Sequence, residues 1–147
     1  MRTTEGTNPT RIVVLGGGFG GVAAARHLER ATKSRGDVEI TLVSRDNFFM
    51  LTPLLFEACT GTLELRHCAQ PIRPALRRAR YVEATVEDVD VERRVVHAVA
   101  AEGATYALPY DHLVVALGAT TNLSLIPGSA SAFTFKTMAD ALVLRNH

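Results

Sequence analysis

The residues of this chain whose types and spacing are best suited to chemistry form a glycine-rich turn near its start. Residues 11–21 read R-I-V-V-L-G-G-G-F-G-G, so a short apolar run leads into five glycines within six positions. In the G-x-G-x-x-G spacing, Gly16 makes the tight turn off a strand, Gly18 lets the backbone approach a pyrophosphate, and Gly21 lets the next helix pack closely. The N–H groups and the positive dipole end of that helix face the phosphates. The turn therefore predicts a dinucleotide-binding site.

Elements that can position this turn are predicted on both sides of it. Residues 12–15 are apolar and indicate a strand, and residues 19–32 carry apolar positions at helical spacing. Residues 38–43 alternate between apolar and polar side chains, which predicts a second strand. A glycine-rich turn that binds nothing is the alternative, but the strand–turn–helix–strand context favours a nucleotide site.

The end of the second predicted strand departs from the usual pattern. An Asp or Glu is expected there, about 20 residues after the glycines, to accept hydrogen bonds from ribose hydroxyls. This chain has Ser44, followed by Arg45 and Asp46. Ser44 can bond a ribose hydroxyl and Asp46 can reach back from the turn, whereas Arg45 would suit the 2′-phosphate of NADP. The fingerprint alone leaves the nucleotide open.

Composition places the chain among globular proteins of ordinary charge. It has 147 residues, 47% of them apolar and 21% charged, with a net charge of +1. These values give no indication of nucleic-acid binding. We expect a cytoplasmic protein, because no apolar run approaches the ~18 residues of a membrane span and no basic-then-apolar leader opens the chain.

The remaining segments complete a predicted α/β fold. Gln70–Ile72 opens a predicted short helix that extends to about Ala79, and residues 81–86 form the next core strand. Residues 87–108 alternate in short stretches and predict an inserted β-meander before a strand at residues 112–117. We expect residues 1–10 to be a flexible tail and residues 11–147 to form a Rossmann-like βαβ domain with a parallel sheet.

Other reactive side chains give weaker signals. Five arginines lie within fifteen residues, which favours a solvated helix face over a phosphate, lipid or partner site: Arg66, Arg73, Arg77, Arg78 and Arg80. Cys59 and Cys68 are predicted to be two free thiols. His67 and His97 lack a companion at metal-ligand spacing, so we predict no metal site. No catalytic acid, base or nucleophile is assigned.

Five segments together resemble a known family. Residues 47–64 read N-F-F-M-L-T-P-L-L-F-E-A-C-T-G-T-L-E and residues 110–122 read Y-D-H-L-V-V-A-L-G-A-T-T-N. With the glycine turn, the I-P-G at residues 126–128 and the F-K-T-M-A-D-A-L-V-L-R-N from Phe135, they resemble the type II NADH dehydrogenases of the pyridine-nucleotide oxidoreductase superfamily. The resemblance extends from Arg11 to Asn146.

The resemblance implies that the first fingerprint holds FAD. Around the pyrophosphate it places Gly16, Gly18, Phe19, Gly20 and Gly21, and in place of the ribose-binding acid it places Ser44 with Arg45 beside it. Toward the flavin it places Asn47, Thr52, Pro53 and Leu54, and by the adenine Val86. Ala116 and Gly118 belong to the family's A-T-G segment. Leu117 replaces the threonine of that segment.

The implied reaction passes a hydride from NADH to the flavin and then two electrons to a quinone, so the flavin carries the chemistry.

Thr137 and Asp140 predict a capped final helix that is still running at His147. No second glycine fingerprint follows, so we expect an N-terminal portion that is inactive alone and prone to associate. The longer parent protein would then bind NAD(P)H and quinone and make peripheral contact with the inner face of the membrane. The resemblance is also compatible with a homodimer of that parent. Alternatives are a non-catalytic or NADP-binding Rossmann module, and a sulfide:quinone oxidoreductase-like flavoprotein fragment.

Overall fold

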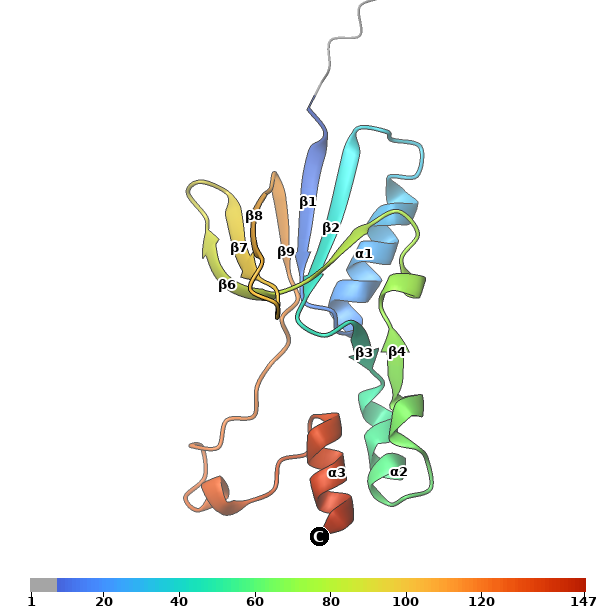
Figure 1. Cartoon of the computed structure of the whole chain (residues 1–147), viewed down its shortest axis with the longest axis vertical. Coiled ribbons are helices and arrows are strands. Elements are labelled where there is room, and N and C mark those ends of the chain that lie inside the picture. The colour runs from blue at the N-terminus through green and yellow to red at the C-terminus, as the bar shows by residue number, and fades with distance from the viewer. Residues whose placement is uncertain (1–7) are drawn as a thin grey trace, which may run out of the picture. The chain divides into compact units, whose positions relative to one another are not determined.

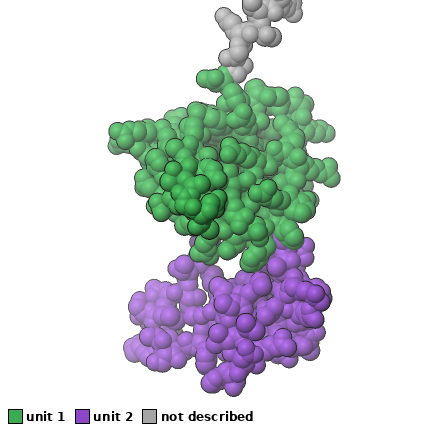
Figure 2. Space-filling model, viewed as in Figure 1, with its two compact units in different colours: residues 1–48, 71–117 green, residues 49–70, 118–147 purple. Residues whose placement is uncertain are grey.

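The computed structural model describes residues 8–147, which form two compact units. Figure 2 colours them separately: the first contains residues 8–48 and 71–117, and the second contains residues 49–70 and 118–147. Most of the expected tail lies outside the described residues. Its last residue, Thr10, was placed there wrongly, because Thr10 begins β1 and pairs with Val38.

A four-stranded parallel sheet forms the centre of the first unit (Figure 1). Its strands, in spatial order, are β5 (Arg80–Glu83), β2 (Val38–Ser44), β1 (Thr10–Leu15) and β9 (His112–Val115). β1 lies between β2 and β9 and is parallel to both. The buried ends of β1 and β2 are apolar, as expected for strands that are covered on both faces.

Helix α1 (Phe19–Ala31) covers one face of this sheet. Val22 and Ala25 are buried on its inner side, and the side chain of Leu28 packs with Ile40 and Val38 of β2. The predicted strand–turn–helix–strand unit is therefore confirmed, with element bounds within two residues of those expected.

The opposite face of the sheet packs on a three-stranded antiparallel meander. Its strands are β6 (Thr85–Asp90), β7 (Val95–Val99) and β8 (Thr105–Pro109), in that order. Val96, Ala98 and Leu108 of the meander share a core with Leu15 and Val43 of the parallel sheet. The first unit is thus a three-layer α/β structure, and the predicted meander is confirmed.

Two sequence expectations for residues 70–86 were wrong. The helix predicted from Gln70 to Ala79 is replaced by β4 (Ala69–Pro71) and a single 3-10 turn, Arg73–Ala75. Pro74 interrupts helical hydrogen bonding there. The single strand predicted for residues 81–86 is divided, because Ala84 donates its N–H to the Ser44 carbonyl and the chain then leaves β5 for the meander.

Glu29, near the end of α1, explains the path of this segment. Its side chain is 6% exposed and accepts hydrogen bonds from the backbone N–H groups of Arg77, Arg78 and Ala79, at 2.8, 2.6 and 2.7 Å. Burial alone would raise the pKa of Glu29, but the three N–H donors outweigh it and lower that pKa. The backbone N–H groups that a helix would use for its own hydrogen bonds therefore bond a carboxylate instead.

We expect Glu29→Gln to lower the free energy of unfolding by about 2 kcal/mol at neutral pH, because a charged acceptor with three donors is lost. Since the pKa is lowered in the folded protein, the stabilisation is present above the ordinary glutamate pKa and is lost as pH falls through the folded value. Urea unfolding of both proteins from pH 7 downward should show the difference shrinking in acid. A constant difference across that range would contradict the electrostatic origin.

The second unit contains short helices and loops. Its elements are β3 (Phe48–Met50), which pairs with β4, the 3-10 turns Thr52–Leu54, Leu65–Cys68 and Ser129–Ser131, and the helices α2 (Leu55–Cys59) and α3 (Met138–Asn146). α2 contacts α3. Thr137 caps α3 and its side chain accepts from the N–H of Asp140, whose carboxylate accepts from the N–H of Thr137, so the predicted capping box is confirmed. Over residues 8–147, no helix has the length and apolarity to cross a membrane.

Candidate nucleotide site

The glycine turn begins where β1 ends. Gly16 has φ +103°, a backbone conformation that favours glycine, and its N–H donates to the Val43 carbonyl at 2.8 Å. A Cβ on Gly16 would lie 2.3 Å from the carbonyl oxygen of Ala116. Gly16 therefore allows the ends of β1 and β9 to approach.

Two further glycines permit close packing inside the turn. A Cβ on Gly21 would lie 1.7 Å from the Gly16 carbonyl oxygen, a distance too short for any side chain at this position. A Cβ on Gly17 would lie 2.5 Å from the Ser44 hydroxyl oxygen and from Ile72. The sequence reasoning assigned no role to Gly17; its signal was only its place among the other glycines.

Gly18 differs from these glycines because nothing lies within 4 Å of the position of its Cβ. It is exposed and forms the N-cap of α1, with no side-chain cap and no acidic residue in the first turn. The N-terminal end of α1 therefore keeps its positive dipole beside open space. Phe19 and Gly20 follow, with Phe19 51% exposed and a Cβ on Gly20 reaching Ala116 only at 3.8 Å. This arrangement suits a phosphate group at the turn.

The turn also lies at the point where the strand order reverses. From β1 the chain passes to β2 and then β5 on one side, and later places β9 on the other side of β1. Ligands of open α/β sheets bind outside the carboxyl ends of the strands at such a point. Gly16, Ser44 and Ala116 stand at the carboxyl ends of β1, β2 and β9, and the sequence prediction had grouped them in one site.

The loop after β2 is held by Tyr81. The Tyr81 hydroxyl donates to the carbonyl of Asp46 at 2.9 Å and approaches that of Ser44 at 3.4 Å. Burial, with the nearby Glu83 carboxylate as a second cause, raises the pKa of Tyr81 to about 12, so the hydroxyl remains a donor at neutral pH. Arg45 extends from this loop into solvent and pairs with Asp46 at 3.3 Å.

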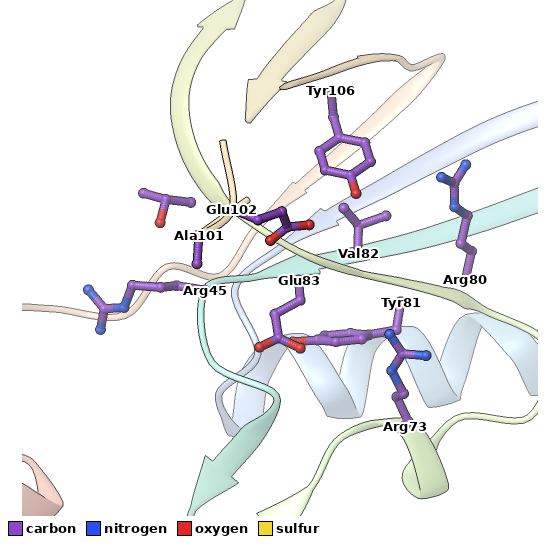
Figure 3. A pocket seen from close by; sticks show the side chains of 10 residues that line it. Arg45, Arg73, Arg80, Tyr81, Val82, Glu83, Ala101, Glu102 and Tyr106 are labelled. Carbon is purple, nitrogen blue, oxygen red and sulfur yellow. The ribbon is translucent and has the colours of Figure 1, made fainter. Parts of the chain in front are cut away.

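A cavity of ≈ 380 Å³ lies beside the carboxyl end of β5 (Figure 3). It is lined by Arg45, Arg73, Arg80, Tyr81, Val82, Glu83, Thr85, Ala101, Glu102 and Tyr106. Only Arg45 among these was a predicted site residue. The sequence did not group the others, because β5, the 3-10 turn at Arg73 and the turn between β7 and β8 meet only in the folded chain.

The other predicted positions are distributed over the two units. Asn47 belongs to the first unit, where its carbonyl accepts from the N–H of Ile72 at 2.9 Å. Val86 lies half-buried in β6. Thr52, Pro53, Leu54 and Gly118 belong to the second unit.

The arginine-rich segment is solvated, but the helix face predicted for it was wrong. Arg73 lies in a 3-10 turn, 5.4 Å from the Tyr81 ring centroid, and Arg80 opens β5. Arg78 donates to the carbonyls of Thr32 and Arg35 after the end of α1. The segment therefore adopts its path through contacts with α1 and β5.

The two cysteines, both in the second unit, are free thiols as predicted. Cys68 is buried and donates to the Leu54 carbonyl at 3.4 Å, and burial raises the pKa of its thiol. Among residues 8–147, no three His, Cys, Asp or Glu side chains form a group able to hold a metal ion.

Comparison with known proteins adds independent information. The family model described as pyridine nucleotide-disulphide oxidoreductase matches residues 10–147. The chain is 39% identical to the type II NADH:quinone oxidoreductase Ndh of Mycobacterium tuberculosis over 74% of this chain and 23% of that protein. NDH2 from Plasmodium falciparum, solved in complex with NADH, superposes with a TM-score of 0.79 at 32% identity, over 92% of this chain and 28% of that chain.

A sulfide:quinone oxidoreductase from Aquifex aeolicus shares the fold, with a TM-score of 0.77 at 24% identity over 93% of this chain and 31% of that chain. At this identity the likeness shows the fold alone. The chain spans about a quarter of the length of the curated relatives that it matches, as the 23% and 26% covered in two of them illustrate.

Proposed function

The chain belongs to the pyridine nucleotide-disulphide oxidoreductase family, and we propose that it is the FAD-binding N-terminal portion of a flavin-dependent NADH:quinone oxidoreductase. The relatives named as NADH:quinone oxidoreductases support this proposal, as does the NADH complex of the structural neighbour. NADH as donor, a quinone as acceptor and peripheral membrane contact are parts of the same proposal for the whole protein.

The observation that carries the proposal is the contrast between Gly18 and its neighbours. Gly16 and Gly21 are required by the packing of the protein on itself, whereas Gly18 faces empty space at the N-terminus of α1. A backbone segment that carries no side chain and faces open space at the positive end of a helix can accommodate a pyrophosphate. The residues present therefore fit the pyrophosphate of FAD.

The residues of the chain would bind and orient the cofactor. When bound, the flavin supplies hydride and electron transfer, for which no acid, base or nucleophile of the protein is required. Gly18 and the first turn of α1 would hold the pyrophosphate, and Ser44 would donate to or accept from a ribose hydroxyl. Val86 would lie by the adenine, while Asn47 and Ala116 would approach the flavin.

The visible absorption spectrum of the purified protein, after incubation with FAD and gel filtration, tests this function. Retained flavin bands near equimolar occupancy are the expected result. NADH oxidation with a soluble quinone, assayed on the whole protein, tests the reaction. A protein that retains no flavin under these conditions would contradict the proposal.

NADP binding is the second candidate function, favoured by one observation. Arg45 lines the cavity together with Arg73 and Arg80, and such a cluster suits a 2′-phosphate.

Two substitutions distinguish FAD from NADP. With FAD, whose ribose hydroxyls are free, we expect Ser44→Asp to bind as tightly as the parent or more tightly, and Arg45→Ala to change the Kd less than about threefold. With NADP the order reverses, because Arg45 would contact the phosphate. Titrations of both variants with both nucleotides measure this, and a large loss for Arg45→Ala with NADP alone would favour the second candidate.

A further inference from the structure

The acid that a dinucleotide site places at the end of its second strand is replaced here by Ser44, whose neutral hydroxyl can bond one ribose hydroxyl, so a carboxylate for the ribose has to come from another strand. We propose that Glu83, at the carboxyl end of the neighbouring strand β5, is this chain's ribose-binding carboxylate and selects against a 2′-phosphate. The inference rests on the proposed nucleotide site.

Register places Glu83 beside the position of the missing acid. β2 and β5 are parallel, and Ser44 pairs directly with Glu83. Both residues are the last of their strands, so both stand at the edge of the sheet where ligands bind. Adjacent strands lie about 4.8 Å apart, a distance that a glutamate side chain can span.

The pleat of the sheet places the two side chains on the same face. Side chains alternate along a strand, and Val82 is in the core shared with the meander, so Glu83 points to the other face, which α1 covers. Ser44 is on this face as well, since its hydroxyl oxygen lies next to the position of a Gly17 Cβ, and Leu42 reaches toward Gly21 of α1. Glu83, Ser44 and the glycine turn therefore share one face of the sheet.

The surroundings of Glu83 leave its carboxylate available. The side chain is exposed, and it lines the cavity that also contains Arg45 and Tyr81 (Figure 3). The Tyr81 hydroxyl bonds the carbonyl of Asp46 and approaches that of Ser44, which connects β5 to the loop after β2. A carboxylate here accepts hydrogen bonds from ribose hydroxyls and repels a phosphate on the same ribose.

The test is the Kd of the purified protein for FAD and for NADP, with Glu83→Gln compared with the parent. We expect about tenfold weaker binding of FAD, because a charged acceptor is lost, and tighter binding of NADP, because the repulsion is removed. Opposite changes with the two nucleotides separate this role from a structural one, which would weaken both. The control is Glu87→Gln, which removes the same charge from an exposed position on β6 outside the cavity and should change neither Kd by more than about twofold.

A second variant places a carboxylate back on β2. Ser44→Asp combined with Glu83→Gln should recover FAD binding, since the acid then occupies its usual strand. If the parent binds FAD and Glu83→Gln binds it equally well, the role of Glu83 is overturned while the proposed function stands. If the parent binds neither nucleotide, the proposed function fails and the role of Glu83 fails with it.

Discussion

Gly18→Val is expected to weaken FAD binding by about 100-fold or more, because its side chain would occupy the open space assigned to the pyrophosphate and also shield the first N–H groups of α1. The fold should tolerate this change. Gly18 has φ −76° and ψ −171°, which valine adopts readily, and no atom lies within 4 Å of the new Cβ. We therefore expect the melting temperature without ligand to fall by about 4 °C or less.

Flavin content after gel filtration and thermal melting of the same samples measure the two effects separately. Gly36→Val is the matched control, since Gly36 also faces open space but lies in the loop before β2. The control should retain flavin as the parent does. Flavin occupancy that is unchanged in Gly18→Val would remove this turn from the cofactor site.

Gly21→Ala is expected to have the opposite signature, with a large loss of stability. The new Cβ would lie 1.7 Å from the Gly16 carbonyl oxygen, so the start of α1 must move away from the end of β1. Both elements lie in the buried part of the first unit, where Val14 and Leu15 are 0% exposed. Overpacking that displaces backbone in a core should lower the free energy of unfolding by about 4 kcal/mol or more.

Urea unfolding of the protein without ligand measures this loss. Gly36→Ala makes the same chemical change where no atom lies within 4 Å of the new Cβ, and should alter stability by less than about 1 kcal/mol. Equal stabilities of Gly21→Ala and Gly36→Ala would show that the turn accommodates a side chain. Together, the valine and alanine variants separate glycines that serve the ligand from glycines that serve the fold.

Parts of the fold whose causes lie close together in the chain were predictable from the sequence. The unit from β1 to β2 depends on apolar spacing within each element and on glycines five residues apart, and its bounds were nearly correct. The capping box of α3 requires only Thr137 and Asp140, three residues apart. The antiparallel meander likewise pairs strands that follow one another directly.

Parts whose causes lie far apart in the chain were not predictable. The segment from Gln70 to Ala79 was expected to be a helix because its own residues allow one at its start, but Glu29 accepts its N–H groups from about 50 positions away. Local propensity is weak compared with three hydrogen bonds to a buried carboxylate.

The sequence by itself therefore predicted the glycine turn with its flanking strand and helix, because the spacing of the glycines and of the apolar residues around them is a local pattern. It also showed that Ser44 stands where an acid is usual. Only the tertiary structure placed Glu83 beside Ser44, and only it showed which atoms a side chain at each glycine of the turn would meet. The physical reason is that strand register and the space around a Cβ are set by segments brought together in folding, about which a linear pattern carries no information.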